Sequence, residues 1–322
     1  MHVFCRPSTS ARLFCHTLPS KSRACDVARI ALLIAFVLSS PTLLRSQSPP
    51  RVESTEALQA NIRSAVQSNA SPEQLGTLWL ALANRYQDRF ELEKAEDSYA
   101  RAIDLLRYTS SQSQYAESLH GMGNVYRTSG RRKEARRCFT TSLNIYTALN
   151  DEANIARLHV ALGLEFLTEH KNREAETEST AALKYFESVP KPDVSYMSGA
   201  YLTRSRATCA QGWCRSALDD VSRAHSLALN KVKENSIEMI SVWMVQGQVQ
   251  MQAGLQADGD QSMNEALRLA QSRTDLPRPY FVTLQLSVLR AQRTSLRAAH
   301  RNQEAKHVED QIAQIEASAP AA

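Results

Sequence analysis

The stretch LWLALANRYQDRFELEKAEDSYARAI (Leu78–Ile103) aligns without gaps with SLHGMGNVYRTSGRRKEARRCFTTSL (Ser118–Leu143). Large, small and aromatic residues occupy the same places in both stretches, and most of these places recur once more at the same interval. Three copies in one register predict a repeat protein. The matching residues are Trp79 and Leu119; Leu82, Met122 and Leu162; Ala83, Gly123 and Gly163; Tyr86, Tyr126 and Phe166; Ala95, Ala135 and Ala175; Tyr99, Phe139 and Ser179; and Ala102, Ser142 and Ala182.

The repeated units have the composition of helices. Ala, Leu, Glu, Gln and Arg dominate, and alternating runs of Val, Ile and Thr are missing. Gly121 and Gly123 nevertheless lie inside a predicted helix, where glycine costs about 1 kcal/mol relative to alanine. A phosphate loop would need a preceding strand and a further glycine, but Tyr126 stands at that place. We therefore interpret Gly123 as a close contact between the two helices of its own unit, and Gly130 as the left-handed residue of the turn between them.

This pattern resembles the tetratricopeptide repeat, whose unit is a pair of antiparallel helices. In that family the first helix carries large-x2-large-small-x2-aromatic and the second carries small-x3-aromatic-x2-small. The unit here is longer than the usual length of about 34 residues, and GNVY (Gly123–Tyr126) is similar to the longer variety, of about 40–42 residues, in kinesin light chain-like proteins. The resemblance implies an all-α, right-handed α-α superhelical solenoid of helix hairpins, whose first helices line a concave groove.

The repeats divide the chain into regions. Residues 1–47 form a leader, 48–74 a linker with a capping helix, 75–316 the solenoid and 317–322 a disordered tail. Arg204 and Asp220 match a family variant in which such residues pair between the two helices. Arg293 replaces the small residue of the last unit, which fits an atypical terminal repeat. The six hairpins are expected at about 76–110, 116–150, 156–188, 198–232, 240–274 and 286–316.

The leader reads as an export signal. It holds six of the 38 basic residues and one of the 33 acidic residues, and its apolar run Ile30–Leu44 is broken by Pro41. A spanning helix needs about 20 residues, so we predict a signal peptide cleaved near Ser46–Ser48 and a periplasmic or secreted protein. The alternatives are an uncleaved N-terminal anchor, which also places the body outside the cytoplasm, and a mis-assigned start codon.

The remainder of the chain carries equal numbers of basic and acidic residues. A basic surface for nucleic acids is therefore not supported, and we expect no nucleic-acid partner and no membrane insertion apart from the possible anchor. Cys138, Cys209 and Cys214 are the cysteines of this body. A disulfide between Cys209 and Cys214 is conceivable in an oxidising compartment, but three small buried residues are the favoured interpretation.

Motifs of catalysis and metal binding are missing from the sequence. It contains no His-Glu-x-x-His spacing, no Cys-x-x-Cys pair and no Gly-x-Ser-x-Gly elbow. We therefore expect a protein that is not an enzyme and that needs no cofactor or metal. The basic run RRKEARR (Arg131–Arg137) is interpreted as the solvated start of a second helix.

The resemblance also implies which side chains face the groove. Asn84 and Asn124 occupy equivalent places, where asparagine in kinesin light chain-like relatives grips the backbone of a bound peptide; the alternative is that both hydrogen-bond within the solenoid. The family's two-carboxylate clamp is rejected, because Leu80, Gly121 and Ala161 stand where its polar residues belong. The expected peptide-binding residues are Asn84, Gln87, His120, Asn124, Arg127, Arg157, Leu164, Arg206, Met244 and Gln248.

Two functions follow from this interpretation. The first is a scaffold outside the cytoplasm that binds a peptide segment of another protein in the groove. The second is a structural subunit of an envelope complex, which uses convex or end surfaces and can self-associate. The sequence does not identify the partner, the oligomeric state or the fate of the leader.

Overall fold

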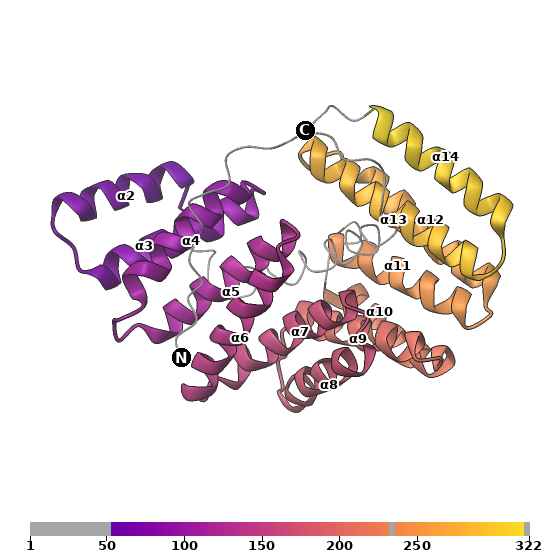
Figure 1. The fold of residues 1–322 in the computed structure, drawn as a ribbon, viewed down its shortest axis with the longest axis horizontal. Coiled ribbons are helices and arrows are strands. Elements are labelled where there is room, and N and C mark those ends of the chain that lie inside the picture. The colour runs from indigo at the N-terminus through magenta and orange to yellow at the C-terminus, as the bar shows by residue number, and fades with distance from the viewer. Residues whose placement is uncertain (1–52, 232–235, 319–322) are drawn as a thin grey trace. The chain divides into compact units, whose positions relative to one another are not determined.

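The computed structural model describes residues 53–231 and 236–318, and in these residues it contains thirteen α-helices and no β-strand (Figure 1). The predicted all-α class is confirmed. The leader and residues 319–322 of the predicted tail lie outside the described residues. Among the helices of the described ranges, none combines the length and apolar character that crossing a membrane requires.

The helices belong to two compact units, and the division falls inside α7 (Glu152–Thr168), after Leu158. In the first unit each helix packs against the next one along the chain, and α3 also contacts α5. Contact between alternate helices is expected where hairpins stack. The helices of this unit that precede α7 are α2 (Thr55–Gln67), α3 (Pro72–Asp88), α4 (Leu92–Leu106), α5 (Gln112–Thr128) and α6 (Arg132–Ala148).

The second unit repeats this arrangement. From α8 to α14 each helix packs against the next, and α11 contacts both α9 and α13. The helix-hairpin stack in each unit confirms a helical-repeat solenoid as the fold class. The helices after α7 are α8 (Asn172–Ser188), α9 (Val194–Ala210), α10 (Cys214–Lys231), α11 (Ile237–Gln252), α12 (Gln256–Ser272), α13 (Arg278–Ala298) and α14 (Asn302–Ser318).

The first helix of each hairpin begins several residues before the predicted range. Helix α3, for example, begins at Pro72, because the Ser71 hydroxyl accepts a hydrogen bond from the Gln74 N–H (3.2 Å) and the Gln74 side chain accepts one from the Ser71 N–H (3.1 Å). Asp193 and Ser236 cap α9 and α11 in a similar way. These caps lie outside the repeating pattern, so the repeat alone places the helix starts too late.

One turn geometry recurs in all six hairpins between α3 and α14. Shortly after each first helix, one residue has a positive φ, between 58° and 98°. The prediction for Gly130 is confirmed, since its φ is 76° and the next N–H, of Arg131, donates to the Tyr126 carbonyl at 2.8 Å. We call this position the turn residue. The turn residues are Phe90, Gly130, His170, Gly212, Gly254 and His300.

The small residue of the repeat lies seven positions before the turn residue and sits against the second helix. A Cβ on Gly123 would lie 2.5 Å from a ring carbon of Phe139 in α6, and a Cβ on Gly163 would lie 3.0 Å from the Ser179 hydroxyl in α8. The interpretation of Gly123 as a helix contact is confirmed. The absence of a side chain at Gly123 and Gly163 lets the two helices of these hairpins lie close together.

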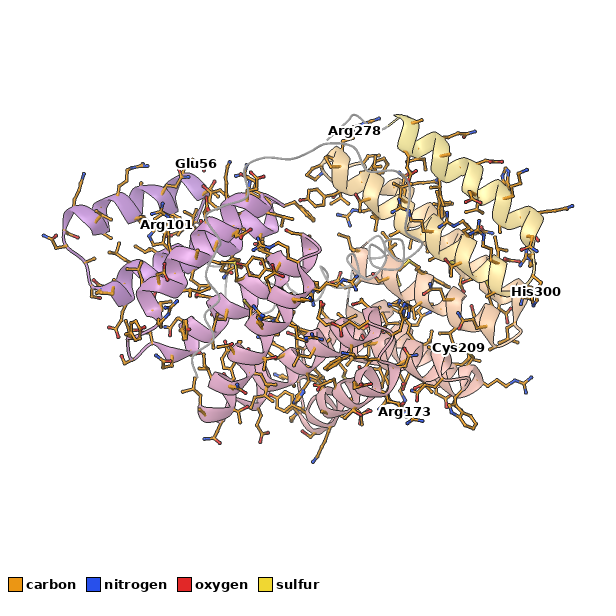
Figure 2. All side chains as sticks on the ribbon, in the orientation of Figure 1. Glu56, Arg101, Arg173, Cys209, Arg278 and His300 are labelled. Atoms are coloured by element: carbon orange, nitrogen blue, oxygen red, sulfur yellow. A yellow bond between two sulfur atoms is a disulfide. The ribbon has the colours of Figure 1, made fainter. Side chains whose placement is uncertain are left out.

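The cysteine interpretation is wrong for two of the three residues. Cys209, labelled in Figure 2, lies near the end of α9 and forms a disulfide with Cys214, the first residue of α10. The turn at Gly212 reverses the chain between them and so brings the two side chains together. Cys138 is buried and lies outside this disulfide, as expected.

We expect Gly130→Ala to lower the free energy of unfolding by about 1 kcal/mol, because a left-handed backbone costs a residue with a Cβ roughly 1–2 kcal/mol. The added Cβ meets no atom within 4 Å, so the backbone conformation is the source of the effect. Urea denaturation measures it. Ser129→Ala, at the neighbouring residue with a φ of −81°, is the control and should change stability by less than about 0.5 kcal/mol. Equal stability of the two variants would contradict the strain assigned to this turn.

Candidate functional site

The turn residue gives the repeats a common register for the predicted site. Five of the ten predicted residues lie six positions before it, in five successive first helices: Asn84, Asn124, Leu164, Arg206 and Gln248. The others lie three positions before it (Gln87, Arg127), ten before it (His120, Met244) and thirteen before it (Arg157). Spacings of three to four residues follow one face of a helix. We call these positions the inner stripe.

In the second unit the neighbouring positions show which way the inner stripe points. Arg204, eight positions before its turn residue, pairs with Asp220 of α10 through two hydrogen bonds of 2.7 Å, as the sequence predicted. Gln246, at the same position of α11, lies 2.6 Å from His225 Nδ1 of α10. Two residues correspond to a rotation of about 200° around a helix. Arg206 and Gln248 therefore lie on the sides of α9 and α11 that face away from α10.

In the first unit, Tyr99 of α4 joins two inner-stripe amides. Its hydroxyl oxygen lies 2.6 Å from Asn84 Oδ1 and 2.9 Å from Gln87 Oε1, and its single proton is donated to one of them. Sequence reasoning placed Tyr99 only as a core aromatic, because it aligns with Phe139, which has no hydroxyl. The phenol in place of the phenyl ring was the signal for this polar contact.

Glu117 of α5 is a second residue that sequence reasoning missed. Its Oε1 lies 3.5 Å from Asn84 Nδ2, and burial raises the pKa of its carboxyl, while the Asn84 contact and the charge of Arg157 oppose that rise. Arg157 itself donates to Asn154 Oδ1 at 3.2 Å. Glu117 lies thirteen positions before Gly130, the inner-stripe position that Arg157 occupies before His170, so the repeat register was the signal that could have found it.

Asn124 and Arg127 form a buried pair on α5. Arg127 Nη2 donates to Asn124 Oδ1 at 2.7 Å, and the guanidinium carbon lies 5.3 Å from the centre of the Phe139 ring. The edge of the same ring meets His120 at a centroid distance of 5.8 Å. The Asn124 side-chain oxygen is thus used within the solenoid, as the alternative interpretation of this residue supposed.

Two of the predicted residues of the second unit are apolar and buried, and two are polar and partly exposed. Leu164 and Met244 are only 1% and 2% exposed, so they contribute to packing more than to an accessible surface. Arg206 and Gln248 are partly exposed, and each has a buried polar atom without a hydrogen-bond partner in the described part of the chain: Arg206 Nη1 and Gln248 Oε1. They are the two members of the inner stripe in this unit with polar groups left to bind something else.

A hollow of about 530 Å³ lies between α12, α13 and α14. Its cation, Arg301, binds Asp260 at 2.7 Å and Glu304 at 2.6 Å, so its charge is already matched by two carboxylates. Within the described residues, no group of three or more His, Cys, Asp or Glu side chains is arranged to hold a metal ion.

Comparison with known proteins identifies the class of this fold. Residues 74–148 match the family model described as the tetratricopeptide repeat, so this part of the chain carries the repeat that the sequence pattern indicated. The spacing of its turn residues, from Phe90 to Gly130 to His170 and then from Gly212 to Gly254, agrees with the longer repeat that was expected. No curated protein sequence matches the chain.

Solved structures share the fold at low sequence identity. The apo form of RapI is 14% identical, with a TM-score of 0.66 over 83% of this chain and 93% of that one. A Rap protein complexed with competence and sporulation factor is 11% identical, with a TM-score of 0.58 over 91% and 98%. Aspartyl phosphate phosphatase F from Bacillus subtilis is also 11% identical, with a TM-score of 0.54 over 93% and 96%. These likenesses establish a common architecture.

We expect His120 to stay neutral in the folded protein well below pH 6. Burial, with the charges of Arg127 and Arg157, lowers its pKa from 6.5 to about 3. Because the unfolded chain binds the proton more tightly, the stability that comes from the neutral ring is complete above about pH 6.5 and is lost as the pH falls toward 3. NMR titration of the ring protons should show no step between pH 7 and 5.

The same effect makes stability depend on pH. His120→Gln should flatten the decrease in unfolding free energy between pH 6.5 and 4, whereas His307→Gln, at an exposed site, serves as the control. An unchanged slope in His120→Gln would show that this imidazole does not control the acid sensitivity.

Proposed function

We propose that the chain is a non-enzymatic scaffold that binds an extended peptide segment of a partner protein at the inner-stripe positions within a unit. The observation that carries the proposal is the position six residues before the turn, where Asn84 in the first unit, and Arg206 and Gln248 in the second, present amides or a guanidinium, while Asn124 and Leu164 at this position are buried. An amide offers both a donor and an acceptor, so it can pair with a peptide backbone without reading its side chains. Such groups at one recurring position suit the regular spacing of an extended chain.

The contacts in the first unit hold part of this stripe in place. The Tyr99 hydroxyl makes its shorter contact, 2.6 Å, with the Asn84 oxygen, and the long 3.5 Å contact to Glu117 leaves the Asn84 amide nitrogen only weakly engaged. A donor whose orientation is already fixed loses little entropy when it binds. Asn84 is therefore the residue of this unit best suited to donate to a peptide carbonyl.

The comparisons support binding as the role of this architecture. One protein of similar fold has been solved complexed with competence and sporulation factor, although another is an aspartyl phosphate phosphatase. Fold alone does not decide function. The non-enzymatic part of the proposal therefore rests on the sequence, which contains none of the catalytic motifs considered above.

We further propose that the scaffold works outside the cytoplasm. The basic and apolar leader supports this location, as does the Cys209–Cys214 disulfide, since disulfides persist mainly in oxidising compartments.

A photo-crosslinker inserted at an inner-stripe position should capture one contiguous segment of one partner in native cells. We would place p-benzoylphenylalanine at Asn84 or Gln248, with the exposed, outward residues Arg137 and Arg173 as matched controls in each unit. Mass spectrometry of the products maps the contact. Crosslinks from the control positions alone, or between copies of this chain, would instead favour the assembly subunit that uses its outer surfaces.

The location is tested by the redox state of one peptide. Trypsin releases Ala207–Arg215, which contains both Cys209 and Cys214. The protein is taken from native cells, quenched with acid and alkylated. We expect the peptide in its disulfide form, which is two hydrogens lighter than the dithiol and carries no alkyl group. A fully alkylated peptide would contradict an oxidising location.

A further inference from the structure

Arg206 is a cation to which the described residues offer no acidic partner. Its Nη1 atom is inaccessible and makes no hydrogen bond there, and burial alone lowers the pKa of the guanidinium to about 10, since no neighbouring acid raises it. Arg204, on the same helix, instead has a bidentate contact with Asp220. Buried charges in proteins are normally paired, because desolvation without a partner is costly. The Arg206 guanidinium is therefore suited to pair with an acidic group of a ligand.

The register of α9 and α11 places Gln248 next to the residue opposite Arg206. Two contacts fix the register of α9 and α11: Ser195 donates to Glu238 Oε1 at 3.4 Å, and Cys209 Sγ lies 2.9 Å from Gln252 Oε1. Both pairs have the same separation in sequence, which places Arg206 opposite Val249, the residue after Gln248. The two side chains also face the same way, away from α10, as shown above.

The unsatisfied atoms of the two residues have opposite requirements. Arg206 Nη1 is a charged donor that needs an acceptor, and Gln248 Oε1 is an acceptor that needs a donor. A free phosphate or sulfate ion would satisfy Arg206 but would bring no backbone N–H for Gln248. An amino-acid residue with a carboxylate satisfies both once the two partly exposed side chains turn toward it, since the carboxylate pairs with the guanidinium and the residue's own N–H donates to the amide oxygen.

We propose that Arg206 and Gln248 form an anchor for one carboxylate-bearing residue of the bound peptide. This inference rests on the proposed peptide-binding function. The carboxylate belongs either to an aspartate or glutamate side chain or to the C-terminus of the segment. The anchor has a single cation, and its amide faces the backbone of the ligand.

The test uses the full-length chain and an array of random dodecapeptides in four forms. The peptides contain or lack acidic side chains, and each set carries either a free or an amidated C-terminus. We expect the unmodified chain to prefer carboxylate-bearing peptides at least about tenfold. Amidation abolishes the preference if the C-terminus is the anchored group, whereas removal of Asp and Glu abolishes it if a side chain is anchored.

Variants then connect the preference to the anchor. Arg206→Gln should remove it, and Arg206→Lys should restore part of it, because lysine keeps the charge but not the planar fork. Arg173→Gln is the matched control: Arg173, labelled in Figure 2, is an exposed arginine of α8, and the substitution changes the net charge equally. Circular dichroism confirms that each variant is folded.

The outcomes separate this inference from the proposed function. Peptide binding without a carboxylate preference, or with a preference that survives Arg206→Gln, overturns the anchor and leaves peptide binding intact. Failure to bind any peptide in the array overturns both. Loss of the preference in Arg206→Gln alone supports the anchor.

Discussion

The close approach of the two helices in each hairpin is the constraint on which the rest of this structure depends. In five of the six hairpins a small side chain lies seven positions before the turn residue, namely Ala83, Gly123, Gly163, Ser205 and Gly247, and the terminal hairpin has Arg293 there. Each of these small residues is buried. With this contact fixed, the rotation of the first helix about its axis is fixed as well. The same small residue therefore determines which side chains form the inner stripe. The inner-stripe position six residues before the turn directly follows this small residue in the sequence.

Hydrogen bonding within the solenoid distinguishes the two parts of the inner stripe. In the first unit the polar side chains form hydrogen bonds within the solenoid: Tyr99 contacts Asn84 and Gln87, and Arg127 donates to Asn124. In the second unit Arg206 and Gln248 keep atoms that the described residues do not satisfy. Hydrogen bonds within the solenoid fix the orientation of side chains, whereas polar atoms without a partner can bind a ligand. A binding surface benefits from both, with rigid positions beside reactive ones.

The sequence was sufficient for features that follow from the repeat. Gly130 in the turn, Gly123 between helices and the Arg204–Asp220 pair all depend on position within one unit, and a pattern that recurs in one register records such positions well. The fold class follows from the same pattern.

Other features depend on contacts that the repeat does not encode. Tyr99 differs from its aligned Phe139 by one hydroxyl, and that oxygen finds its partners only once α3 and α4 are packed. Glu117 shares the register position of Arg157, but its contact with Asn84 joins α5 to α3, and the disulfide needs the particular turn at Gly212 to bring Cys209 to Cys214. Leu164 and Met244 were expected on an accessible face, but neighbouring elements bury them.

The recurrence of the turn residue has an evolutionary consequence. The turn residues Gly254 and His300 are farther apart in the sequence than Phe90 and Gly130. The inner-stripe positions nevertheless keep a fixed distance in sequence from the turn residue of their own hairpin. Residues can therefore be inserted or deleted between hairpins, as in 189–193 or 273–277, without shifting the ligand-facing side chains of the next hairpin. Duplication of a whole hairpin would lengthen the recognition surface by one position, so such a gene could acquire a longer target by recombination alone.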